Sequence, residues 1–221
     1  MRYLKFKNSE EQVPIGKLVC IGRNYEAHAK ELGGEASTEF PIIFLKPASN
    51  VIFSGSNVIH PNYSENLQHE IELVIYIGEE VKNATDEQAE KAIYGYTVGL
   101  DMTLRDLQFR LKEKGEPWTL AKCFDTAAVI GEVLLKNEYK LRGDENISLS
   151  VNDVTKQNSS LSNMIFNAVQ CVKHISSRMT LEKGDLIFTG TPEGVSRVVP
   201  GDKLFGQIEN ISSIETTITK G

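Results

Sequence analysis

The stretch HEIELVIYIG, residues 69–78, constrains the fold of this chain more than any other. From Ile71 onward it consists of branched, aliphatic and aromatic residues and ends on a glycine, which is typical of a buried strand. Side chains alternate between the two faces of a strand, so Glu70 and Glu72 share one face, about 6.5 Å apart. The sequence therefore predicts two carboxylates side by side at the start of a strand that is otherwise apolar.

This pair of carboxylates has two explanations. At an effective dielectric constant of about 20, two negative charges at this spacing repel by about 2.5 kcal/mol. Water could relieve the repulsion if the start of the strand is exposed. Alternatively, a divalent cation binds both glutamates, and Asp101, which ends the apolar stretch YGYTVGL, is a third acid that could join them. Spacing alone also allows Asp101 to be an ordinary helix N-cap.

A site made only of carboxylates favours particular metals. Hard oxygen ligands with room for water suit Mg²⁺ or Mn²⁺, and Ca²⁺ less specifically. Three such ligands leave about half of an octahedral shell open for water and substrate. His69 precedes Glu70 and therefore faces the other side of the sheet, so we expect it to be satisfied by hydrogen bonds rather than by the metal. Lys46, extended before a proline, receives only a weak substrate-side role.

Composition excludes several classes of protein. The 221 residues suit one domain, with at most a short appendage. A net charge of −6 without a long basic run argues against a nucleic-acid partner. No apolar run approaches the roughly 18 residues that a membrane span needs. Three widely spaced cysteines predict no disulfide framework, and the N-terminus lacks an apolar signal region, so we expect a reducing, cytoplasmic setting.

Local patterns predict a mixed α+β domain, in which strands outnumber short helices, built around a rolled or barrel-like sheet. Residues 24–34 are expected to form a helix capped by Asn24, and residues 85–93 a helix capped by Thr85. Thr103 and Asp106 have the spacing of a capping box for a helix over 103–115. Further predictions are a long helix within 162–179 and a hairpin over 50–61 that turns on Ser-Gly-Ser.

Six motifs then follow in order: CIGRNYEAHAKEL, FLKP, HEIEL, LDMTLRDLQ, PWTLAK and GDLIFTGTPEGV. Together they resemble the fumarylacetoacetate hydrolase family, and most of all its short, single-domain members that act on acylpyruvates and oxaloacetate. The resemblance implies a single catalytic β-roll domain over residues 18–221, similar to the family's C-terminal domain. It also implies an Mg²⁺ or Mn²⁺ ion and a homodimer. Residues 1–17 lie outside it and are expected to be a lead-in strand and turn.

The resemblance also implies roles for individual residues. It assigns the metal ligands to Glu70, Glu72 and Asp101, the catalytic groups to His28, Glu31 and Lys122, and substrate binding to Arg105, Gln108 and Thr191.

Without the resemblance, most of these residues have plainer explanations. His28 and Glu31, three residues apart, would usually form a solvated helix face. Lys122 could extend its ammonium group outward to water. Arg105 could form a structural ion pair, and Thr191 could belong to a simple turn between strands.

The implied substrate is a small 2-oxo or 1,3-diketo acid, whose carboxylate and ketone oxygens can chelate one metal ion. The ion acts as a Lewis acid that stabilises an enolate. Glu31 could orient the imidazole of His28, which takes a proton from the attacking water.

Three reactions share this enolate: hydrolytic C–C cleavage of acylpyruvates, decarboxylation of oxaloacetate, and isomerisation of a 2-hydroxyhepta-2,4-diene-1,7-dioate. The dyad favours hydrolysis, with decarboxylation as a second activity and isomerisation as the alternative. A non-catalytic protein with a structural metal is the alternative from a different class.

Overall fold

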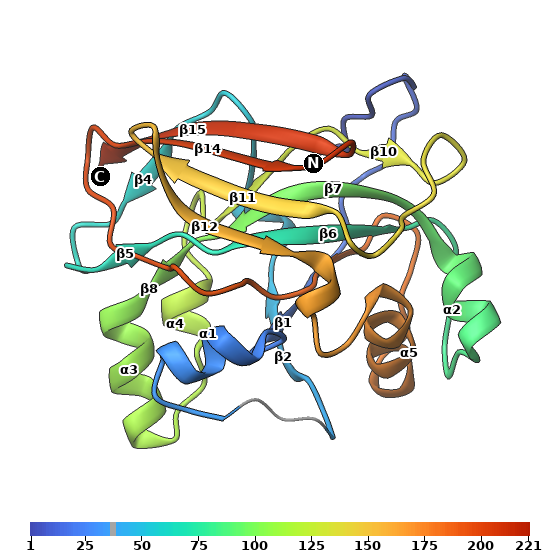
Figure 1. The fold of residues 1–221 in the computed structure, drawn as a ribbon, viewed down its shortest axis with the longest axis horizontal. Helices are drawn as coiled ribbons and strands as arrows, with labels where there is room; N and C mark the ends of the chain where they lie inside the picture. Colours follow the sequence, from blue (N-terminus) through green and yellow to red (C-terminus); the bar gives the residue numbers. More distant parts are fainter. Residues whose placement is uncertain (36–38) are drawn as a thin grey trace.

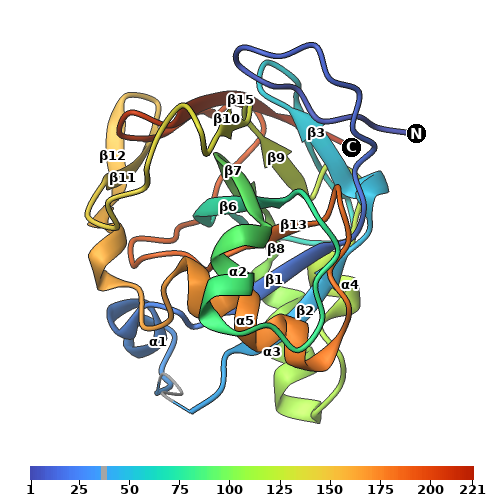
Figure 2. The ribbon, with the colours of Figure 1, turned by 90° about the vertical axis from the view of Figure 1, so that its right-hand side faces the viewer.

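The computed structural model of the protein describes residues 1–35 and 39–221. Most of its strands belong to two sheets that curl around a shared apolar core, and short helices cover the outside (Figures 1 and 2). Figure 2 shows the strands curving around the centre of the molecule as an open roll. This arrangement confirms the α+β class and the rolled sheet that the sequence predicts.

The larger sheet carries the stretch on which the sequence analysis began. It has eight strands, in the order β2-β1-β13-β6-β7-β9-β3, with β10 paired to β7. These strands are β1 (Leu18–Gly22), β2 (Ile42–Lys46), β3 (Val51–Phe53), β6 (Ile71–Ile77), β7 (Ile93–Asp101), β9 (Ala128–Ile130), β10 (Leu134–Leu135) and β13 (Leu186–Phe188). Every residue of β6 is buried, because neighbouring elements cover both faces of this central strand.

A second sheet lies against the central strands of the first. Its order is β12-β11-β14-β15-β4, and in Figure 1 its strands β11, β14 and β15 lie above β6 and β7. Its members are β4 (Val58–His60), β11 (Asn146–Val151), β12 (Val154–Ser160), β14 (Lys203–Ile208) and β15 (Ser212–Lys220). A short antiparallel pair, β5 (Leu67–Gln68) with β8 (Thr103–Leu104), lies beside the start of β6.

Helices cover the opposite side of β6 and β7, where α1, α3 and α5 lie below the strands in Figure 1. The helical segments are α1 (Glu26–Glu31), the 3₁₀ turn η1 (Ala48–Asn50), α2 (Asp86–Ala92), α3 (Arg105–Lys114), α4 (Thr119–Lys122), η2 (Leu161–Asn163) and α5 (Ala168–Arg178). Thr85 caps α2 as predicted, in a reciprocal capping box with Gln88. None of the helices in the described ranges is long and apolar enough to span a membrane.

The predicted hairpin over residues 50–61 is wrong. The chain does turn at 54–56, but β3 pairs in parallel with β9 in the larger sheet. β4 pairs in parallel with β15 in the second sheet. An isolated hairpin of three-residue strands would be marginally stable, so each strand instead extends a sheet built by distant parts of the chain.

Two predicted helix caps are also wrong, because tertiary contacts use the polar side chains elsewhere. The N-cap of α1 is Tyr25 without a side-chain hydrogen bond, and the amide of Asn24 instead binds the backbone of Phe166 and Thr189. Thr103 belongs to β8, so α3 begins at Arg105 without a side-chain cap.

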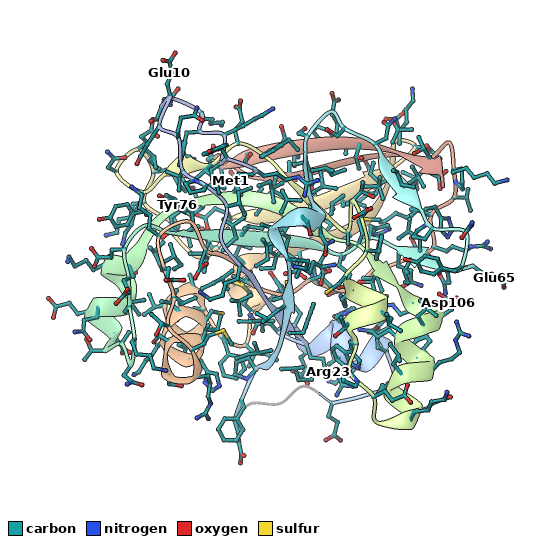
Figure 3. All side chains as sticks on the ribbon, turned by 180° about the vertical axis from the view of Figure 1, so that it is seen from behind. Met1, Glu10, Arg23, Glu65, Tyr76 and Asp106 are labelled. Carbon is teal, nitrogen blue, oxygen red and sulfur yellow. The ribbon has the colours of Figure 1, made fainter. Side chains whose placement is uncertain are left out.

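The side chains of Asp106 and Asn167 explain where the structures of α3 and α5 differ from the predicted helices. Asp106 accepts hydrogen bonds from the Ser64 hydroxyl and the Glu65 amide, and Figure 3 shows Asp106 and Glu65 close together at one end of the molecule. The helix predicted within 162–179 starts at Ala168, because Asn167 forms a capping box with Gln170.

The first seventeen residues pack against the larger sheet. Leu4, Phe6, Val13 and Ile15 are buried in a second apolar cluster together with residues of β1, β6 and β13. Phe6 forms a parallel bridge with Val133. This segment therefore contributes to the core, a role that its sequence alone did not indicate.

Candidate active site

Antiparallel pairing of β6 and β7 brings three acids to one edge of the larger sheet. Ile71 pairs with Leu100, so the start of β6 meets the end of β7, and the Asp101 amide donates to the Glu70 carbonyl at 2.9 Å. One carboxylate oxygen from each of Glu70, Glu72 and Asp101 lies within 4.8 Å of the others. Glu72 is 1% exposed and Asp101 0%, which rules out water as the relief for their repulsion.

Buried cations lie among these acids. Lys122 Nζ lies 2.6 Å from Glu70 Oε2 and 2.7 Å from Asp101 Oδ2. Lys46 Nζ is 2.8 Å from Asp101 Oδ1, and the guanidinium of Arg105 forms an ion pair with Glu70. At formal charges, three carboxylates therefore face three cations.

The positive charges are not shared equally among the three carboxylates. Burial alone would raise the pKa of Glu70, but the positive charges of Lys122 and Arg105 outweigh it and hold the pKa far below its usual value. Burial raises the pKa of Glu72 well above its usual value, and the charges of Asp101 and Glu70 add to this effect. Glu72 is the acid that most lacks a positive partner.

The three acids fit a divalent cation with oxygen ligands. Within the described residues Glu72 forms no ion pair, and the hydrogen bond from the Gly190 amide to its Oε2, at 2.7 Å, leaves the carboxylate with capacity for another ligand. The buried Oδ1 of Asp101 forms an ion pair with Lys46 but accepts no hydrogen bond from any described residue. Hard oxygens at this spacing suit Mg²⁺ or Mn²⁺.

The predicted dyad forms on α1. His28 Nδ1 lies 3.0 Å from Glu31 Oε2, and the Gly194 amide donates to Glu31 Oε1 at 3.0 Å. Burial alone would raise the pKa of Glu31, but the hydrogen bonds from His28 and Gly194 outweigh it and keep the pKa below its usual value. Because Glu31 binds Nδ1, the other ring nitrogen of His28 remains available for a substrate or water.

One pocket brings the predicted residues together. It is lined by seven of the nine residues that the sequence singled out, namely His28, Glu70, Glu72, Arg105, Gln108, Lys122 and Thr191. The other two residues do not line the pocket but contact residues that do: Glu31 binds His28, and Asp101 binds Lys122. The buried side chains of Arg105 and Gln108 also bind each other, so the guanidinium is held at the pocket wall.

The remaining wall of the pocket is aromatic. Phe44, Phe109 and Trp118 line it, and the rings of Phe44 and Trp118 pack edge to face with centroids 5.9 Å apart. Arg23 and Lys112 add positive charge to this lining. A ligand here would have an anionic end among the cations and an apolar part against the rings.

Sequence reasoning undervalued Lys46 and missed Gln157. Lys46 is buried and also donates to the Met102 carbonyl at 3.1 Å; its signals were a lysine at the end of an apolar strand, before a proline, and its place in the motif FLKP. Gln157 lies in β12, where nothing in its sequence surroundings distinguishes it, yet it is fully buried and binds Thr191. The prediction for His69 is confirmed, since Gln157 and Ser196 satisfy its ring nitrogens at 2.8 and 3.0 Å.

Comparison with known proteins gives consistent matches over nearly the whole chain. A sequence profile described as "Fumarylacetoacetate (FAA) hydrolase C-terminal" matches residues 17–219. The chain is 41% identical over 204 residues to the mitochondrial oxaloacetate tautomerase FAHD1 of Arabidopsis thaliana, covering 92% of this chain and 91% of that protein. It is 43% identical over 186 residues to the mitochondrial oxaloacetate decarboxylase of Dictyostelium discoideum, covering 84% and 85%.

Solved structures give the same result. The fumarylpyruvate hydrolase of Pseudomonas aeruginosa, crystallised with Mn²⁺ and pyruvate, superposes with a TM-score of 0.96. It is 37% identical in sequence, and the match covers 100% of this chain and 96% of that one.

Proposed function

This chain belongs to the fumarylacetoacetate hydrolase family, and on that premise we propose that it is an Mg²⁺- or Mn²⁺-dependent enzyme acting on small 2-oxo acids. The observation that carries the proposal is the convergence of three buried carboxylates beside the His28–Glu31 dyad in one pocket. A purely structural ion would need neither a base nor a set of buried cations at its side.

The charges of the pocket support a doubly charged substrate. The three acids and the cations Lys46, Lys122 and Arg105 cancel at formal charges. A divalent ion held by Glu70, Glu72 and Asp101 would then leave a surplus of two positive charges. Oxaloacetate, or an acylpyruvate in its enolate form, carries two negative charges and would neutralise that surplus.

Individual residues of the pocket have separate proposed roles toward the substrate. The ion, when bound, would supply Lewis acidity for enolate charge on a 2-oxo acid. Arg105 and Thr191 would hold the substrate carboxylate, and Lys122 would place its ammonium group beside the oxygen on which charge develops. Gln108 would keep the Arg105 guanidinium in position.

We propose C–C hydrolysis of acylpyruvates as the main activity, because the dyad supplies what hydrolysis needs beyond an enolate. Glu31 fixes one tautomer of His28, whose other nitrogen would take a proton from water as that water attacks the distal carbonyl. Oxaloacetate is a second substrate, because decarboxylation and tautomerisation need only the enolate. The names of the Arabidopsis and Dictyostelium relatives support this second activity.

A homodimer is part of the same proposal, following the family resemblance. β2 is an edge strand of the larger sheet and α4 contacts it; Leu45 on β2 and Leu120 on α4 are exposed (46% and 67%). An apolar sheet edge of this kind is suited to an interface with a second copy. Sedimentation equilibrium would distinguish a dimer from a monomer.

A substrate panel tests the proposed function. Purified protein is mixed with acetylpyruvate or oxaloacetate, each with Mg²⁺, with Mn²⁺ or with a chelator, and loss of substrate absorbance is followed. We expect metal-dependent turnover of acetylpyruvate and slower turnover of oxaloacetate. An inactive protein under all these conditions, or one equally active in chelator, would contradict the proposal.

A further inference from the structure

Gln157 connects the candidate substrate site to β6 through four hydrogen bonds. Its Nε2 lies 2.8 Å from Thr191 Oγ1 and 2.8 Å from the Pro192 carbonyl. Its Oε1 lies 2.8 Å from His69 Nδ1 and 3.2 Å from the Ile71 amide. The side chain is fully buried, so these partners alone satisfy it.

Two backbone groups fix which end of the amide donates. The Ile71 N–H can only donate, so the atom facing it must be the acceptor Oε1. The Pro192 carbonyl can only accept, so the atom facing it must be the donor Nε2. The reversed amide would oppose donor to donor and acceptor to acceptor, which excludes it in a buried site.

The directions of the bonds that Gln157 forms with His69 and Thr191 follow. Gln157 Oε1 accepts from His69, so Nδ1 of that ring carries the proton. Gln157 Nε2 donates to Thr191 Oγ1, which therefore uses a lone pair on this bond and retains its own O–H proton. Among the described residues none accepts that proton, and Thr191 lines the pocket.

We propose that Gln157 is a positioning residue that orients the Thr191 hydroxyl so that its proton is directed to the substrate. A threonine hydroxyl without this partner could turn its proton in other directions, whereas here the N–H of Gln157 occupies one lone pair and leaves the proton for an anionic oxygen in the pocket. The inference rests on the proposed function, and its ligand is the carboxylate of a small 2-oxo acid. Gln157 itself would not touch that ligand.

A double-mutant cycle on pyruvate binding tests this role. The variants Q157M, T191V and Q157M/T191V are loaded with Mn²⁺, and pyruvate affinity is measured by calorimetry beside KM and kcat for oxaloacetate. T191V should weaken pyruvate binding by about tenfold to a hundredfold, as expected for loss of a hydrogen bond to a charged group. Q157M should weaken it about tenfold alone and less than about twofold when T191V is already present.

Two controls separate positioning from a merely structural role. In a T191S background the hydroxyl is retained, so Q157M should again cost about tenfold. Mn²⁺ affinity should be the same in Q157M and wild type, whereas general damage to β6 would weaken it through Glu70 and Glu72. If Q157M does not fold, Q157E replaces it, because its length is the same and its direct charge effect cancels between the two backgrounds.

The possible results distinguish a failure of the proposed function from a failure of the proposed role of Gln157. A wild type that neither binds pyruvate nor turns over oxaloacetate would overturn the proposed function and this inference with it. An active wild type in which the Gln157 substitution is harmless, or equally costly with and without the Thr191 hydroxyl, would overturn the role of Gln157 alone.

Discussion

At the scale of single residues, Glu72 is the most revealing group in the candidate site. It shares a buried edge with two other acids, and burial together with their charges raises its pKa well above the usual value. A protein that only needed a stable strand end would gain from an apolar residue here, because an unpaired buried charge is costly. Its presence is explained if a cation binds there.

Substitution of Glu72 should therefore act mainly on metal binding. E72Q removes one charged ligand while keeping the shape of the side chain. We expect Mn²⁺ to raise the melting temperature of the wild type, and we expect its affinity for E72Q to fall by more than the roughly 10–100-fold that loss of an outer-shell partner costs. A thermal-shift titration with Mn²⁺ measures both. Equal metal stabilisation of the two proteins would show that Glu72 is not a ligand.

His28 allows a separate test of the chemistry. H28A should lower kcat for acetylpyruvate by about 10²–10⁴-fold, because general-base catalysis contributes that much, while Mn²⁺ affinity and the melting temperature stay close to wild type. Decarboxylation of oxaloacetate should fall less, since it needs no activated water. Steady-state kinetics with both substrates give the comparison. Parallel losses on the two substrates would remove His28 from the hydrolytic step.

At the scale of elements, the site depends on where strands end and on the turn that follows β13. Gly190 has φ +94°, and its amide donates to Glu72. A Cβ at this position would lie 2.7 Å from the Cβ of Asn24, whose side chain anchors the segment leading into α1. The glycine is therefore required both by its backbone conformation and by close packing.

A methyl group at Gly190 should disturb stability and metal binding together. We expect G190A to cost about 1–3 kcal/mol of unfolding free energy, from strain at positive φ and from the close contact. Mn²⁺ affinity should also fall, because the amide that orients Glu72 moves. Urea unfolding and the Mn²⁺ titration measure the two effects. G33A is the matched control, since Gly33 also has positive φ but an added Cβ there meets nothing within 4 Å.

Helices and strands were predictable from the sequence where the signal lay in neighbouring residues. They were not predictable where pairing with a distant strand determines the structure. The buried strand β6 and the capping of α2 by Thr85 needed only neighbouring residues, and both predictions are confirmed. The hairpin over 50–61 failed because β9 and β15, both far along the chain, are the real partners of its two strands.

The same distinction between local and distant signals determines which parts of the candidate site could be predicted. Glu70 and Glu72 could be paired from the period of a strand, but the approach of Asp101 depends on the antiparallel register of β6 with β7. Gln157 reaches Thr191 from the other sheet, 34 positions away, so no local pattern could have found it.

At the scale of the whole molecule, buried polar anchors hold loops to the roll outside the candidate site. Glu145 is fully buried and accepts from the Arg142 and Gly143 amides at 2.7 and 2.9 Å and from the Tyr139 hydroxyl at 2.9 Å. Burial alone would raise its pKa, but these hydrogen bonds outweigh it and lower the pKa below the usual value.

This anchor should make stability depend on pH in a defined direction. A carboxyl group with a lowered pKa in the folded state contributes stability above its unfolded pKa, about 4.3 for Glu, and loses it as pH falls through the folded value. E145Q should therefore be less stable than wild type by about 1–3 kcal/mol at pH 7, and the difference should shrink below about pH 4. Urea unfolding across this pH range measures it, and a difference that grew in acid would contradict the assignment.

The central claim is that Glu70, Glu72 and Asp101 hold one divalent ion that keeps open positions for a 2-oxo acid. Anomalous diffraction from crystals soaked in Mn²⁺ tests this most directly. We predict a single strong peak about 2.1 Å from one oxygen of each acid, with the remaining positions filled by water or added pyruvate. A peak elsewhere, or an ion enclosed completely by protein ligands, would contradict it.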